Sequence, residues 1–317
     1  MPSIDYDHDD FPIGRMPASG HRLTVTWDEI LWAAITVGRP DLYHVFEHGE
    51  SSLYEAMFRW SMIRMSLEQR GPSGNRLYRT PAFKHMDPTE KGAVNYFLGL
   101  VICKLFAAKL LNAPWTLHLD IWRNILNPVL LAGRSRPDMV AQSASSAEWY
   151  AFECKGRASM PGEAEKAKAK SQAERIVSVD GRNCTLHVGS ITHYRGDVLQ
   201  FYWRDPEPTV RKPLKIPDPS GAWRMYYEPF VEAYRSYRSV SRRAPASRPA
   251  TIQELDLTLG IHPSIAEPLL ASDWQRVRRL ARELYGEFKE GGYQPDGLRV
   301  IAGDSWQSRH EEPTLLR

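Results

Sequence analysis

The chain has 317 residues, of which 42% are apolar and 25% are charged, a composition typical of a globular protein that excludes wholesale disorder. Its formal net charge of +3 does not by itself indicate a nucleic-acid partner, so any basic surface must be local. The three cysteines, Cys103, Cys154 and Cys184, are far apart and fit neither a zinc motif nor a disulfide framework, which favours a reducing cytoplasmic location.

The N-terminal quarter is predicted to be a tail followed by helices. Residues 1–20 are rich in Asp, Pro and Gly, which is typical of a flexible tail. Residues 21–79 show helical signals, with Thr26 before an acidic first turn and a capping-box pattern of Ser52 and Glu55 ahead of an apolar stripe. We therefore expect an N-terminal helical region there.

A long helix is predicted from Asp87, a good N-cap followed by Pro88, to about Leu111. Glu90 lies at the start of the inward apolar stripe of this helix, where it would either cap the helix or reach into a site. The apolar stretch 98–111 is too short to span a bilayer, which takes about 20 residues, and no membrane association is expected.

Strands follow the helix. Residues 115–122 alternate and predict a first strand, and residues 134–157 predict a hairpin that supplies the second and third. In the third strand the alternation separates an apolar face from a face with charge; the two sets are Tyr150, Phe152 and Cys154, and Ala151, Glu153 and Lys155.

The charged face of this hairpin is the main candidate site. Glu153 and Lys155 share one face of a mostly buried strand, and Asp138 on the neighbouring strand can join them. Burying such groups is costly unless a function uses them, although a structural ion cluster is an alternative. Two acids and a lysine suit Mg²⁺-dependent phosphodiester hydrolysis.

The remaining core elements are a helix from about Glu163 to Val177, a strand over Cys184–Ile191 and a further strand near Leu199–Trp203. Within a predicted core of residues 80–205, the order over residues 87–195 is therefore helix, three strands, helix, strand, and the strand near Leu199–Trp203 follows it.

Pro137-Asp138, fourteen intervening residues and then Glu153-Cys154-Lys155 resemble the Pro-Asp…Asp/Glu-x-Lys motif of the restriction-endonuclease-like, or PD-(D/E)XK, nuclease superfamily. The core of that family has the same order: helix, three-stranded meander, helix, strand. The resemblance implies a mixed α/β fold with this core and with helical N- and C-terminal additions.

The resemblance also implies a mechanism. Asp138, Glu153 and the carbonyl of Cys154 are expected to bind Mg²⁺, for which Mn²⁺ would substitute, and Lys155 is expected to act on the attacking water and the phosphate. Glu90 would supply an extra acid, and Gln172 would lie beside the lysine unless it is an ordinary partly buried amide. The expected substrate is DNA rather than RNA, in restriction or anti-phage defence.

Arginines are the candidate phosphate-binding residues. Arg134, Arg136 and Arg157 flank the acids. Within the Pro- and Arg-rich connection 206–250, Arg238, Arg242 and Arg243 lie among tyrosines and serines, either as a DNA contact or as a solvated linker. Residues 251–317 are predicted to be a helical module and tail that binds substrate, a partner protein or a second copy of the chain.

Two other functions fit parts of the sequence. His44, Glu47 and His48 have the His-x-x-Glu-His order of a zinc hydrolase, but Pro40 and Gly49 leave room for little more than two helical turns. A degenerate nuclease fold that only binds nucleic acid is the other alternative. The retained acids and lysine argue against that second alternative.

Overall fold

The computed structural model gives the arrangement of most of the chain. The described residues are 1–12, 14–17, 21–38, 50–70, 75–120, 129–130, 136–146, 148–179, 182–205, 226–227, 230–231, 234–235, 237 and 247–307.

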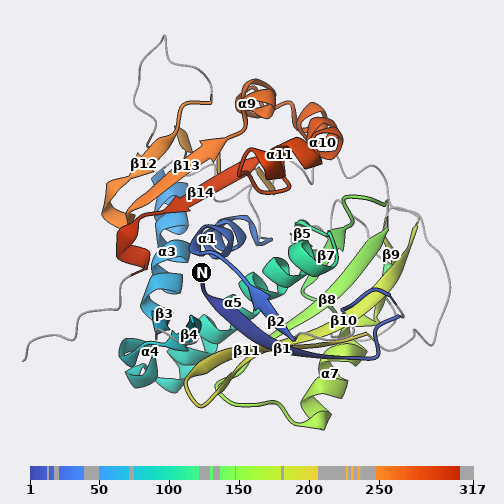
Figure 1. Cartoon of the computed structure of the whole chain (residues 1–317). Coiled ribbons are helices and arrows are strands. Elements are labelled where there is room, and N and C mark those ends of the chain that lie inside the picture. The colour runs from blue at the N-terminus through green and yellow to red at the C-terminus, as the bar shows by residue number, and fades with distance from the viewer. Residues whose placement is uncertain are drawn as a thin grey trace, which may run out of the picture.

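A large mixed sheet forms the centre of this α/β fold (Figure 1). Its main strands, in spatial order, are β2 (Arg22–Thr24), β1 (Ser3–Asp9), β4 (Arg76–Arg79), β11 (Val198–Arg204), β10 (Arg182–Arg195), β8 (Trp149–Gly156), β7 (Met139–Gln142) and β5 (Trp115–His118). The short strands β3 (Leu67–Arg70), β6 (Val129–Leu130) and β9 (Ile176–Val179) pair at its margins. Most ladders are antiparallel, but β8 runs parallel to β10, and β1 runs parallel to β11 and β4.

Helices cover both faces of the sheet. Among the described residues before the C-terminal part, the helices are α1 (Trp27–Thr36), α3 (Glu50–Ser66), α4 (Pro81–His85), α5 (Pro88–Leu110) and α7 (Glu163–Ala173). Helix α5 packs behind β8, where the thiols of Cys154 and Cys103 approach each other. On the opposite face α7 lies so close to β10 that a Cβ at Gly189 would be 2.5 Å from the Lys170 backbone nitrogen.

Helix α5 is long and apolar enough to cross a membrane, judged by length and composition alone. However, 78% of its most apolar window is buried inside the protein. Its apolar surface packs against the sheet and against α1.

Two glycines bring α5 against the strand that carries the candidate site. A Cβ at Gly156 would lie 1.7 Å from the carbonyl oxygen of Asn95, and one at Gly99 would lie 2.9 Å from the Lys155 backbone carbon. The helix backbone can approach Lys155 and Gly156 only because neither glycine has a side chain. This contact holds the end of β8 in place.

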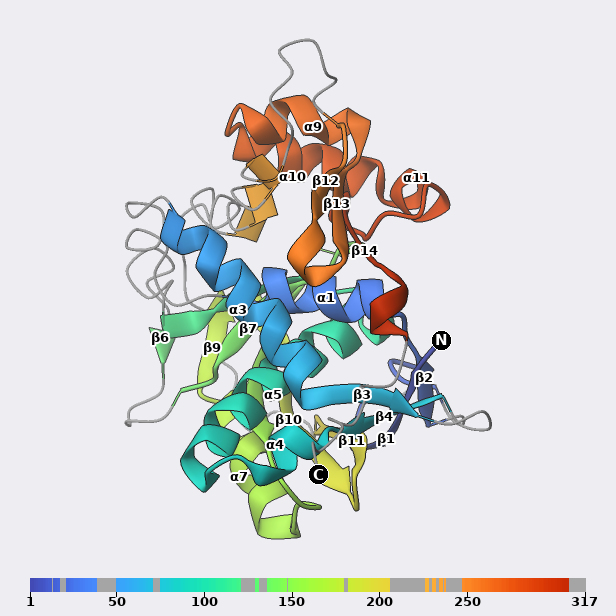
Figure 2. The ribbon, with the colours of Figure 1, turned by 90° about the vertical axis from the view of Figure 1, so that its left-hand side faces the viewer.

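The C-terminal residues form a second, smaller layer, which we call the C-terminal module (Figure 2). Its elements are β12 (Ala250–Ile252), η1 (Gln253–Leu255), β13 (Leu257–Ile261), α9 (Pro263–Leu270), α10 (Trp274–Glu283), α11 (Tyr285–Glu290), β14 (Leu298–Ala302) and η2 (Asp304–Trp306). The three strands form a separate antiparallel sheet in the order β12-β13-β14.

A buried polar network fastens the C-terminal module to the core. The Lys104 ammonium on α5 donates to the Tyr226 hydroxyl at 3.0 Å, and that hydroxyl donates to Asp296 at 2.6 Å. The indole of Trp32 on α1 donates to the same carboxylate at 2.5 Å. All four side chains are buried, and the network ties four distant parts of the chain together.

Several expectations for the N-terminal part were wrong. Residues 3–9 of the predicted tail form β1, because Ile4 and Tyr6 alternate inward and pack on the core. The predicted helical region 21–79 also contributes β2, β3 and β4 to the sheet. Its Thr26 cap is present as a full capping box, whereas Ser52 lies inside α3 instead of capping it.

The C-terminal prediction of helices alone was also wrong. Residues 250–252 and 257–261 are strands, because Leu257, Leu259 and Ile261 alternate inward with the period of a strand. Ser272 does not cap α10; its N-cap is Asp273, which accepts from the Arg276 amide. In the core, the predicted helix to Val177 ends at Ala173, and the chain continues directly into β9.

Candidate active site on β7 and β8

The antiparallel ladder of β7 and β8 brings Asp138 next to Glu153 and Cys154. Met139 pairs with Phe152, so the residue before Met139 lies beside the residues after Phe152. The Asp138 Oδ2 atom accepts a 2.8 Å hydrogen bond from the backbone N–H of Cys154. In a strand the N–H and C=O of one residue point to the same edge, so the Cys154 carbonyl also faces the Asp138 side.

Glu153 and Lys155 lie on the same face of β8, as the alternation predicts. The Lys155 ammonium forms an ion pair with Glu153 Oε1, and the other carboxylate oxygen, Oε2, is buried without a hydrogen-bond partner among the described residues. Glu153 is only 1% exposed. The site thus contains a buried acid with one unused oxygen, which is energetically costly in isolation.

Both carboxylates have a raised pKa, chiefly because they are buried. Burial, followed by the neighbouring Asp138 charge, raises the pKa of Glu153 to about 7. Burial also raises the pKa of Asp138, although the Cys154 amide and Lys155 act in the opposite direction. A cation bound between the two acids would relieve both effects.

Three further residues adjoin Asp138, and sequence analysis did not identify them. The Tyr96 hydroxyl on α5 donates to Asp138 Oδ1 at 3.3 Å, and its ring is 45% exposed. The His118 ring nitrogen Nδ1 donates to the Asp138 carbonyl at 3.1 Å, and burial lowers the pKa of this imidazole to about 4, so it is neutral. The charge of Asp120 contributes to the raised pKa of Asp138.

Little in the sequence indicates that Tyr96, His118 and Asp120 lie beside Asp138. Tyr96 stands on an exposed helix position, and only the packing of α5 turns it toward Asp138. His118 and Asp120 depend on the register of β5 against β7, which no local pattern specifies.

Glu90 and Gln172 are placed away from these contacts. Glu90 is exposed and accepts from the Asp87 backbone N–H at 3.3 Å, which is its role in the capping box of α5. Gln172 is half-buried on α7, and its side-chain oxygen has no hydrogen-bond partner among the described residues. Within the described part of the chain neither residue makes a hydrogen bond or ion pair with Asp138, Glu153 or Lys155.

The described flanking arginines are paired with acids. Arg136 pairs with Asp120, and Arg157 pairs with Glu165 at 2.8 Å. Arg157 and Glu165 are both more than 40% exposed in their side chains, and such surface pairs contribute about 0–1 kcal/mol, so a phosphate can replace the acid. The other arginines and the zinc motif lie outside the described residues: Arg134, Arg238, Arg242, Arg243, His44, Glu47 and His48.

No group of three or more His, Cys, Asp or Glu side chains that could hold a metal is found in the part of the chain that the structure describes. The candidate set is therefore two carboxylates and a backbone carbonyl. Comparison with family models, with curated protein sequences and with solved structures found no significant match. Any functional assignment therefore depends on the geometry of this site.

Proposed function

We propose that this protein is a Mg²⁺-dependent nuclease that hydrolyses phosphodiester bonds in DNA, with a restriction-endonuclease-like core formed by α5, β5, β7, β8, α7 and β10. The observation that carries the proposal is the convergence of Asp138, Glu153 and Lys155, with Asp138 held by the Cys154 amide at 2.8 Å. These elements follow one another along the chain in the order helix, three strands, helix, strand, which supports the proposal.

The donor set suits Mg²⁺. This ion is usually bound by one or two carboxylates, with waters and substrate phosphates completing its octahedron, so two acids suffice. Asp138, the unpartnered Glu153 Oε2 and the Cys154 carbonyl would hold the ion. When bound, Mg²⁺ supplies charge stabilisation at the phosphate and lowers the pKa of a bound water. Mn²⁺ has similar ligand preferences and would substitute.

Lys155 lies next to Glu153 and is the proposed cationic group of the site. Its ammonium already contacts Glu153 Oε1, so it lies within reach of a water or phosphate oxygen at the same carboxylate. In the proposed mechanism it orients the attacking water and offsets the charge that develops on the phosphate. A cation bound at the site would lower the raised pKa of Glu153, so Glu153 would be ionised when the metal is bound.

Tyr96 and His118 position Asp138. The Tyr96 hydroxyl and the Cys154 amide each donate to one carboxylate oxygen, which fixes the plane of that carboxylate. The neutral His118 ring holds the Asp138 backbone. Arg136 and Arg157 would exchange their present acids for flanking phosphates.

The test is cleavage of plasmid, linear duplex, single-stranded DNA and RNA with Mg²⁺ by the full chain. Asp138→Asn and Lys155→Ala should each abolish Mg²⁺-dependent cutting while the far-UV circular dichroism spectrum is unchanged. The Asp197 and Lys84 side chains form a similar ion pair on the surface, so Asp197→Asn and Lys84→Ala are matched controls that should cut normally.

Unchanged cutting by Asp138→Asn or Lys155→Ala would refute the mechanism. A wild-type protein that binds DNA but never nicks it with any divalent metal would instead indicate a nuclease fold used only for binding.

A further inference from the structure

Helices α9 and α10 form a helix-turn-helix pair in the C-terminal module. Helix α9 ends at Leu270, three residues intervene, and α10 begins at Trp274. The turn is tight: Ser272 has a left-handed φ of 62°, and the Asp273 N–H donates to the Pro268 carbonyl at 2.9 Å. The Asp273 side chain then caps α10.

The inner faces of both helices are anchored in the core. Ile265 and Leu269 on α9 and Val277 and Ala281 on α10 are fully buried. Because these pairs are spaced four residues apart, one face of each helix points inward and the opposite face of α10 is left on the surface.

That outer face carries groups that recognise nucleic acid. Gln275, Arg276 and Arg279 are exposed and lie within one arc of the helix, since they are separated by one, three and four positions. Among the described residues no acid forms an ion pair with Arg276 or Arg279. The helix has four arginines and one glutamate, the exposed Glu283, so it carries a net positive charge on a nearly neutral protein.

We propose that α9 and α10 bind double-stranded DNA, with α10 lying in the major groove. A helix fits the major groove of B-form DNA, where arginine pairs with guanine and glutamine pairs with adenine. The deep, narrow major groove of duplex RNA does not admit a helix, which disfavours RNA. A protein partner is disfavoured because the outer face has none of the large apolar anchors found at protein interfaces.

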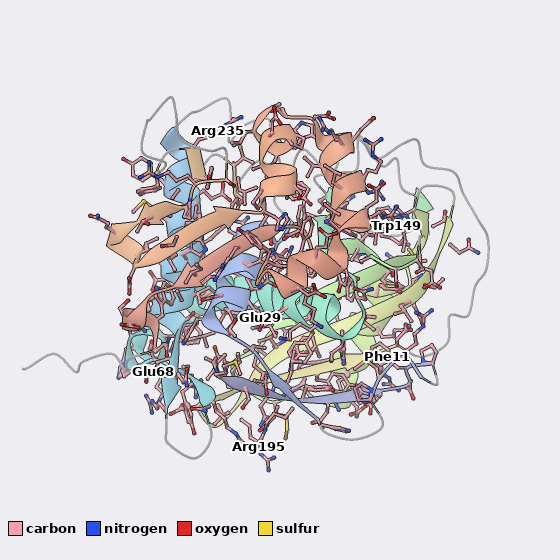
Figure 3. The ribbon with its side chains drawn as sticks, turned by 45° about the horizontal axis from the view of Figure 1, so that its top comes forward. Phe11, Glu29, Glu68, Trp149, Arg195 and Arg235 are labelled. Carbon is pink, nitrogen blue, oxygen red and sulfur yellow. The ribbon has the colours of Figure 1, made fainter. Side chains whose placement is uncertain are left out.

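The position of α10 connects this surface to the candidate active site. The Arg278 guanidinium donates to the Gln142 side chain at the end of β7, and Gln142 pairs with Trp149 at the start of β8. Trp149 accordingly lies near the helices of the C-terminal module in Figure 3, whereas Arg195 lies at the far end of the molecule.

Asp138 precedes the other end of β7, four residues from Gln142, which corresponds to roughly 13 Å. A duplex that extends from α10 along β7 would therefore reach the candidate active site. This last step depends on the proposed nuclease function, whereas DNA binding by α10 does not.

Binding is measured with the full chain and a labelled duplex of about 25 base pairs in EDTA, so that no cutting occurs. The double variant Arg276→Ala/Arg279→Ala should bind the duplex about tenfold more weakly or worse, and the slope of its salt dependence should fall by about 0.9 for each phosphate that it no longer binds. Arg195→Ala removes an exposed arginine elsewhere and should leave affinity within about twofold. Gln275→Ala should relax the base preference of duplexes selected from a randomised pool.

Unchanged duplex affinity in the double variant, at an unchanged melting temperature, would overturn the proposal. So would an equal loss of affinity for single-stranded RNA and duplex DNA, because that pattern indicates general charge attraction. The two proposals fail separately: Asp138→Asn should bind duplex normally and not cut, whereas the arginine variant should lose binding even in EDTA.

Discussion

The backbone N–H of Cys154 donates to the Asp138 carboxylate at 2.8 Å, and this hydrogen bond joins the two halves of the candidate active site. It orients an acid from β7 toward the strand that carries Glu153 and Lys155. The bond forms at the point where the ladder of β7 and β8 ends, since Met139 and Phe152 are the last pair in register. The acid that would hold the metal therefore uses a backbone donor that the sheet leaves free.

Mg²⁺ should stabilise the folded protein through this site. A ligand that binds only the folded state at ten times its Kd raises the free energy of unfolding by about 1.4 kcal/mol. Thermal unfolding of the wild type should therefore shift upward with Mg²⁺ or Mn²⁺, and Asp138→Asn should show no shift. Asp197→Asn, which changes a surface aspartate elsewhere, should respond like the wild type. A shift that survives in Asp138→Asn would place the metal at another site.

Alanine substitution at two glycines of α5 should have opposite effects on the stability of the protein. Gly92 has open space around its Cα, so Gly92→Ala should stabilise the protein by about 0.5–1 kcal/mol through helix propensity. A Cβ at Gly99 would lie 2.9 Å from the Lys155 backbone, so Gly99→Ala should destabilise it by about 1–3 kcal/mol and also slow DNA cutting by displacing Lys155. Urea unfolding measures both; equal effects would show that α5 does not pack this closely on β8.

Substitutions at the buried residues Lys104 and Asp296 should have strongly coupled effects on stability. Lys104→Met removes the cation that faces Asp296 through Tyr226, so it should lower the free energy of unfolding by about 3–5 kcal/mol. The double variant Lys104→Met/Asp296→Asn should lose clearly less than the sum of the single changes, because no charge is then left unpaired. A double-mutant cycle by chemical denaturation tests this, and strictly additive losses would argue against the network.

Acid should destabilise the protein through His187. Burial lowers the pKa of this imidazole; its Nε2 donates to the Ile176 carbonyl at 2.8 Å, and its Nδ1 is buried near Lys170. Above pH 6.5 both the folded and the unfolded state hold it neutral. As the pH falls below 6.5, His187 binds a proton in the unfolded chain but not in the folded state. The free energy of unfolding therefore falls by at most about 1.4 kcal/mol per pH unit.

The measurement is the melting temperature between pH 7 and pH 5. His187→Gln should show a shallower decline than the wild type, whereas the exposed His85, changed to Gln, should leave the decline unchanged. Identical slopes for His187→Gln and the wild type would contradict the assignment. The other buried histidines contribute equally to both proteins, so the difference reports His187.

Local patterns in the sequence predicted the elements whose cause is local. The Thr26–Glu29 capping box, the start of α5 at Pro88 and the alternation of residues 150–155 follow from hydrogen bonds and side-chain directions within a few residues. The same reasoning failed for β1, β12 and β13. Short strands are stabilised by partners that are distant in sequence. The Asp-rich segment of β1 has the composition of a flexible tail, and it forms a strand because it pairs with β11.

The sequence by itself determined that Glu153 and Lys155 share a face, because side chains of a strand alternate whatever surrounds it. It also indicated Asp138 as their partner through the motif spacing. Only the tertiary structure decided that Tyr96 and His118 hold that aspartate, that Glu90 serves as a cap, and that α10 lies beside β7. These contacts join residues from separate elements, and they depend on how the sheet and helices pack as a whole, which no short-range pattern encodes.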